Sequence, residues 1–167
     1  MDTPPRYTSR PLPDYRHFPG TTPHPTRHPS GHSYGGAGAT DLPDLNRTDW
    51  RDCEDYLYGI DLFNQGYWWE CHEVLEGLWL AAGRRSPAGH ALQAVIQCAA
   101  AHLKMTTRHP LSAGRLFAHS LRHLAHSGPA ILGLDLDLML RDTRAFLNRQ
   151  SAAGAHLVLD FREPTPQ

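Results

Sequence analysis

A histidine and a glutamate stand four residues apart in a segment that is rich in large apolar side chains. They are His72 and Glu76, and the same segment carries Trp68, Trp69 and Trp79. An α-helix turns by about 100° per residue, so Glu76 would lie about 40° and Trp79 about 20° from the direction of His72. Burying ionisable groups among apolar ones is costly unless they are paired or bound to something. The pattern therefore marks a candidate site.

A metal site is the first of three interpretations. An i, i+4 pair presents two ligands on one helical face, and imidazole with carboxylate suits a divalent zinc, manganese or iron ion. The string differs from the HExxH motif of zinc proteases, because Glu76 stands where that motif has its second histidine. Further ligands would have to come from Asp61, Glu73, a glutamine or a distant histidine. In a metal-dependent hydrolase, His72 and Glu76 would hold the ion, and Glu73 or Asp61 would be the catalytic residue that activates water.

Two interpretations need no metal. In one, Glu76 raises the basicity of His72 and the pair performs acid–base chemistry behind tryptophan walls. In the other, the pair is a buried structural network within a non-enzymatic binding or dimerisation module. The sequence leaves all three open.

Helices on either side are expected to complete the site. The pair lies in a predicted helix over residues 67–82, followed by Gly83, and the next helix begins at Ser86-Pro87, an N-cap followed by an N1 proline. A short turn favours antiparallel packing of these two helices, which would bring a polar stripe of the later helix toward His72 and Glu76. The expected binding pocket consists of Asp61, Asn64, Trp69, Trp79, Gln93 and Gln97.

The remaining pattern predicts an all-α bundle of about five helices over residues 45–167. The first helix would follow a cap at Thr48 and end near Gly66, and the fourth would run from Pro110 to the break at Gly128-Pro129. The fifth is expected over about 135–148. The apolar run 157–161 is expected to be an extended strap across the bundle.

Residues 1–44 have a different composition. They hold nine of the 14 prolines and few apolar residues, and they show no helical or strand period. Such a segment is expected to be a disordered tail, because it buries too little surface to offset its ordering entropy. The alternative is a histidine-rich docking or metal-binding arm.

The bulk composition excludes some function classes. With 16 basic and 17 acidic residues, the chain has no broad positive field for nucleic acid. No apolar run approaches the roughly 20 residues that span a bilayer. The three cysteines show no CxxC spacing, which argues against a structural zinc site. We expect a soluble cytoplasmic protein with no nucleic-acid or membrane partner, and homo-oligomerisation and a small-molecule ligand stay open.

Several other ionisable or metal-binding side chains are not expected to form a functional site. Glu70 is expected to face solvent, and His102 to be partly exposed. Cys71 is expected to be a packed thiol. His119, His123 and His126 form a metal-compatible stripe on the fourth helix, although a solvated face is the favoured reading.

The motifs together resemble a known family. Residues 59–66 (GIDLFNQG) and 69–79 (WECHEVLEGLW) are similar to the His-x-x-x-Glu-x-x-Trp core of the bacterial and archaeal family catalogued as domain of unknown function 309. Residues 92–104 also fit, and the resemblance covers roughly residues 50–126. It implies a small helical fold, and the family's loose label is predicted metal-dependent hydrolase. The matching motif positions are Asn64, Gly66, Glu70, His72, Glu73, Glu76, Trp79, Gln93 and Gln97.

Overall fold

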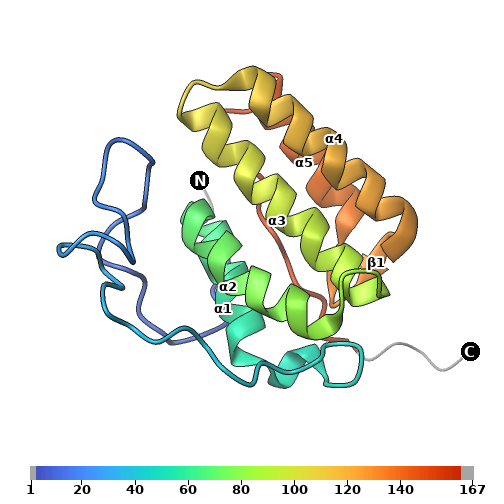
Figure 1. The fold of residues 1–167 in the computed structure, drawn as a ribbon. Helices are drawn as coiled ribbons and strands as arrows, with labels where there is room; N and C mark the ends of the chain where they lie inside the picture. Colours follow the sequence, from blue (N-terminus) through green and yellow to red (C-terminus); the bar gives the residue numbers. More distant parts are fainter. Residues whose placement is uncertain (1–2, 163–167) are drawn as a thin grey trace, which may run out of the picture.

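Five α-helices form the framework of the computed structural model, which describes residues 3–162 (Figure 1). A 3-10 turn at Trp50–Asp52 precedes α1, and the short strands β1 and β2 form an antiparallel pair before α5. The prediction of a mainly helical bundle is confirmed. The bounds are Glu54–Asn64 for α1, Trp68–Ala82 for α2, Pro87–Thr106 for α3, Pro110–Ser127 for α4, Ala130–Ile131 for β1, Leu134–Asp135 for β2 and Leu136–Leu147 for α5.

Local signals in the sequence place several helix ends. The hydroxyl of Ser86 accepts a hydrogen bond from the backbone N–H of Gly89 at 2.9 Å, which caps α3 as expected. Gly83 and Gly128 end α2 and α4 with φ angles of 86° and 80°, a conformation that glycine adopts without strain. The start of α1 differs from the prediction, because Asp49 rather than Thr48 caps the 3-10 turn that precedes it.

The β-hairpin was not predicted. Leu132 and Gly133 connect its strands with φ angles of 55° and 72°. Two positive φ angles in a two-residue connection are typical of the turns that join tightly paired strands. A two-residue strand is too short to show an alternating pattern in the sequence.

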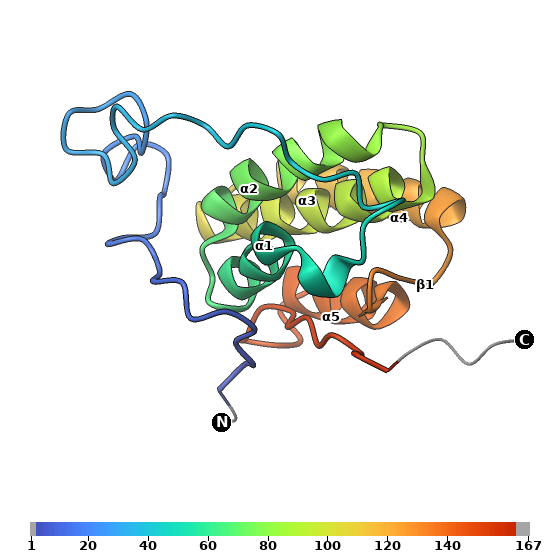
Figure 2. The ribbon, with the colours of Figure 1, turned by 90° about the horizontal axis from the view of Figure 1, so that it is seen from below.

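Helix α3 lies at the centre of the fold. It packs against α2 on one side and α4 on the other, α1 packs on α2, and α5 lies against α3 and α4 (Figures 1 and 2). The largest fully buried side chains come from four of the five helices and include Tyr56, Phe63, Leu75, Leu92, Leu136 and Met139.

The predicted C-terminal strap is confirmed. Leu157 and Leu159 are buried, while Val158 between them is 59% exposed. The backbone of Leu157 forms two hydrogen bonds with the Asn64 side chain. The strap lies beside the N-terminal segment, because the Leu159 N–H donates to the hydroxyl of Tyr7 at 2.8 Å (Figure 2).

The prediction of a disordered N-terminal tail was wrong for the described residues from 3 onward. This segment runs along α1 and α2, and His17 within it is only 5% exposed (Figure 1). Its anchors are buried carboxylates of the helices, which accept its backbone N–H groups, and such anchors leave no periodic signal in the segment itself. No helix in the described residues is long and apolar enough to cross a membrane.

Candidate functional site

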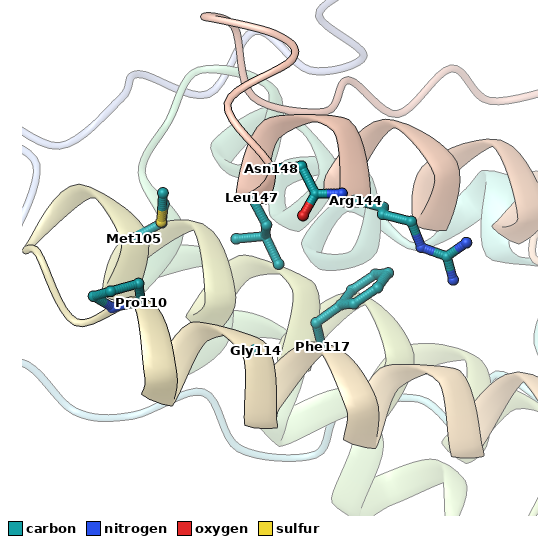
Figure 3. A pocket seen from close by; sticks show the side chains of 7 residues that line it. All are labelled: Met105, Pro110, Gly114, Phe117, Arg144, Leu147 and Asn148. Atoms are coloured by element: carbon teal, nitrogen blue, oxygen red, sulfur yellow. The ribbon is translucent and has the colours of Figure 1, made fainter.

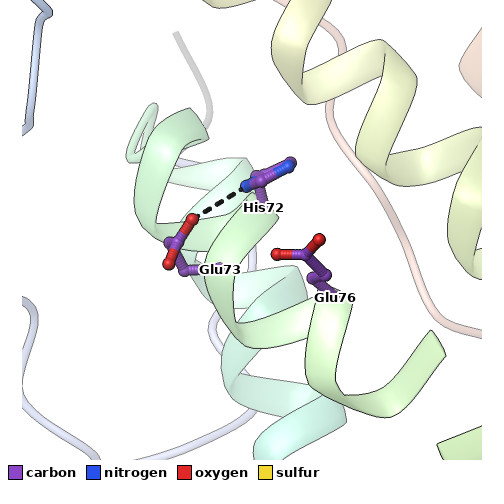
Figure 4. A group of neighbouring side chains, drawn as sticks. All are labelled: His72, Glu73 and Glu76. Atoms are coloured by element: carbon purple, nitrogen blue, oxygen red, sulfur yellow. Dashed lines mark hydrogen bonds and ion pairs between the residues drawn. The ribbon is translucent and has the colours of Figure 1, made fainter. Parts of the chain in front are cut away.

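His72, Glu73 and Glu76 form a cluster on one side of α2 (Figure 4). Each offers one potential ligand atom, and the three atoms lie within 4.8 Å of one another. Glu73 Oε1 lies 3.2 Å from His72 Nδ1, within hydrogen-bonding distance. Helical periodicity brings His72 and Glu76 together, and the bond to His72 adds Glu73 from the edge of the same face.

Two carboxylates control the protonation of the histidine. The hydrogen bond that the His72 ring donates to Glu73 raises the pKa of His72 above its ordinary value, and the negative charges of Glu73 and Glu76 act in the same direction. Partial burial opposes them. The two carboxylates therefore place negative charge beside His72, which attracts either a proton or a metal cation to the cluster.

The His72 cluster is less buried than the structural-network interpretation would require. The side chain of His72 is 36% exposed and that of Glu73 is 44% exposed, and Glu76 is half-buried. The groups are thus accessible to a ligand.

Asp61 and Asn64 bind the terminal segments and are not joined to the His72 cluster by any bond among the described residues. The Asp61 carboxylate is fully buried and accepts bonds from Arg6, Tyr7 and Thr8. Asn64 bonds to Leu157 in the strap. Asp61 therefore has a structural set of partners, and Glu73 is the better placed of the two candidate catalytic carboxylates.

The other expected pocket residues take different positions. Trp69 packs edge-on against the rings of His17 and His24. Trp79 lies beneath the guanidinium of Arg84. Within residues 3–162, three buried polar atoms of the expected pocket have no hydrogen-bond partner: Trp79 Nε1, Gln93 Oε1 and Gln97 Oε1. They lie on α2 and α3, which pack against each other.

Two further expectations are corrected. Glu70 is 4% exposed and does not face solvent, because the N-terminal segment covers it and its Oε1 contacts His17 N and His32 Nε2.

His102 is fully buried instead of partly exposed. Its Nδ1 donates to the Cys98 carbonyl, and its Nε2 accepts the Ala155 N–H. Burial lowers its pKa to about 4. Cys71 is a packed thiol as predicted, and burial raises its pKa.

Cavities occur near the cluster and elsewhere. A cavity of about 160 Å³ lies between the N-terminal segment and α2, and Glu73 lines it together with Glu70, His32 and Trp69. A larger cavity of about 350 Å³ lies on the far side of the bundle, between α4 and α5, with Phe117 and Arg144 in its wall (Figure 3). The smaller cavity is therefore the one that adjoins the candidate site.

The structure is that of a small helical protein with a compact His/Glu cluster on its second helix. Residues 56–116 match the family described as Domain of unknown function (DUF309), which confirms the resemblance inferred from the motifs. The matched segment contains α2 with the cluster and all of α3. No curated protein matches the chain.

Proposed function

We propose that the chain is a metal-dependent hydrolase with its cation site at His72, Glu73 and Glu76. The observation that supports this most directly is the convergence of one imidazole and two carboxylates within 4.8 Å on a partly exposed helical face. The residue types fit the proposed ion, because a nitrogen and carboxylate oxygens suit zinc, manganese or iron. A bound divalent ion would polarise the scissile bond and activate water.

The residues of the cluster have separate roles in this proposal. His72 and Glu76 are the protein ligands, one turn apart on α2. Glu73 contacts His72 Nδ1, so it orients the imidazole and leaves Nε2 free, as carboxylate partners of metal-binding histidines commonly do. Glu73 is also the carboxylate that faces the adjoining cavity, where it can accept a proton from a water molecule.

Metal analysis of the untagged full chain tests the cation site. We expect one tightly bound zinc, manganese or iron ion per chain, lost in His72→Ala and Glu76→Gln while the helical circular dichroism stays unchanged. His156→Ala is the matched control, because that histidine is exposed and lies outside the cluster. An equal metal content in His72→Ala and the parent chain would refute the proposal.

Turnover of chromogenic phosphate and carboxylate esters tests the hydrolase part. Glu73→Gln should retain the ion but lose about 100-fold or more in kcat, which is the usual contribution of a general base. Ion retention with undiminished activity would remove Glu73 from the mechanism.

Ligand binding without catalysis is the second candidate function. It is favoured by the unpartnered buried atoms of Trp79, Gln93 and Gln97, since buried polar groups normally have partners and a ligand can provide them. Under this alternative, Gln93→Leu and Gln97→Leu would weaken ligand binding, and the chain would show no ester turnover at all.

A further inference from the structure

Three histidines from two helices lie side by side at the surface of the α3–α4 pair. They are His90 of α3 and His123 and His126 of α4. The Nδ1 atoms of His90 and His123 are 3.0 Å apart. The rings of His90 and His126 are stacked, with centroids 4.8 Å apart and an interplanar angle of 26°.

The core beneath these rings fixes the separation of the two helices. The hydroxyl of Ser120, which is fully buried on α4, donates to the carbonyl of Ala94 on α3 at 2.6 Å. The same hydroxyl lies 3.2 Å from Cys98 Sγ. These contacts lie about one turn from His90 and His123. The approach of the two imidazoles is therefore set by helix packing, which pre-positions their nitrogens.

The surroundings of His90 and His123 disfavour their protonated form. Partial burial lowers the pKa of His90 and of His123, and the neighbouring histidines lower both values further. The charged groups that act on His123 are His90, His119, His126 and Arg122. No carboxylate in the described residues pairs with His90, His123 or His126. A neutral imidazole has a free lone pair, which is the form that binds metal.

We propose that His90, His123 and His126 form a second metal site, separate from the His72 cluster, for a borderline-soft divalent ion such as Zn²⁺, Ni²⁺ or Cu²⁺. Tetrahedral zinc with ordinary Zn–N bonds places two ligand nitrogens about 3.3 Å apart, close to the separation of His90 and His123. His126 is exposed, so its ring can rotate out of the stack to provide a third nitrogen. An all-imidazole site disfavours Mg²⁺ and Ca²⁺, which prefer oxygen ligands.

The site would join α3 to α4. An ion that binds only the folded chain stabilises it by an amount that grows with the logarithm of its concentration relative to the dissociation constant. Acid should release this ion, because protons compete with a metal for imidazole nitrogens.

Calorimetric titration with Zn²⁺ tests this proposal on the untagged full chain carrying His72→Ala, which removes the proposed first site. We expect one equivalent to bind and to raise the melting temperature. His90→Gln and His123→Gln should each weaken binding by roughly tenfold or more, because each variant removes one of the three proposed imidazole ligands. His119→Gln is the matched control, one turn away on the same helix face, and should bind as tightly as its parent.

Imidazole NMR spectra provide a second readout that does not depend on the variants. On addition of Zn²⁺, the ring signals of His90, His123 and His126 should shift together, while that of His119 should stay in place. Undiminished binding in His123→Gln, or shifts confined to other histidines, would overturn the proposal. So would Zn²⁺ that fails to bind, which would show that His90 and His123 form only a hydrogen bond.

Discussion

The backbone N–H of Tyr7 donates a 2.6 Å hydrogen bond to the carboxylate of Asp61, across 54 residues of sequence. Asp61 is fully buried, and the backbone and hydroxyl of Thr8 complete its contacts together with Arg6. The Asp61 carboxylate of α1 thus holds residues 6–8 against this helix. This relationship makes the N-terminal segment part of the folded domain.

Asp61→Ala should therefore lower the free energy of unfolding by about 3 kcal/mol, because it leaves several donors without their acceptor. Urea denaturation measures the change. The matched control is Asp55→Ala on the same helix, whose pair with Arg10 is exposed and should contribute at most about 1 kcal/mol. Equal losses in the two variants would contradict the structural role of Asp61.

Sequence patterns predicted the helices but not the ordering of the N-terminal segment. Helix ends are encoded locally, as at Ser86 and Gly83, where a cap or a positive φ angle depends on one residue. The segment is ordered by Asp61 and Glu70, which lie 54 and 53 residues beyond the backbone N–H groups of Tyr7 and His17 that they bind. Hydrogen bonds between single polar groups that lie far apart in the sequence produce no periodic pattern of residue types. The sequence therefore does not reveal them.

The candidate site was likewise predicted only in part, because its local spacing is encoded in the sequence and its exposure is not. Helical periodicity alone places His72 and Glu76 on one face. Their exposure depends on how α2 packs against α3, which the periodicity of α2 does not specify. The approach of His90 to His123 likewise depends on the register between α3 and α4, although the spacing of histidines on α4 was visible in the sequence.

Acid should destabilise the fold through His102. Burial lowers its pKa to about 4 from an ordinary value of 6.5, so the unfolded chain binds a proton more readily between these values. Stability should be fully present above pH 6.5 and should fall as the pH drops toward 4, by up to about 3 kcal/mol. His102→Gln should be less stable at pH 7 but should lose less stability on acidification. His28→Gln, at an exposed histidine, should keep the parent's slope.

The protonation of His72 should respond to Glu73 more than to Glu76. The hydrogen bond to Glu73 is the largest cause of the raised pKa, and the charge of Glu76 is a smaller one. NMR titration should show that Glu73→Gln lowers the pKa of His72 and that Glu76→Gln lowers it less. Because the pKa is raised in the folded chain, the associated stability is present below the unfolded value and is lost as pH rises through the folded one. The reverse order of the two variants would contradict the observed hydrogen bond.

Glu70 should hold residues 17–32 of the N-terminal segment against α2. Its Oε1 accepts the His17 N–H at 2.8 Å and lies 3.0 Å from His32 Nε2, and both side chains of the His32–Glu70 pair are at least nine-tenths buried. Glu70→Ala removes both contacts, so amide hydrogen exchange should accelerate in this part of the segment while α1 and α3 stay protected. Glu73→Ala is the control, because the Glu73 carboxylate contacts His72 instead. Unchanged exchange in Glu70→Ala would show that packing of Trp69 against His17 and His24 is sufficient to hold the segment.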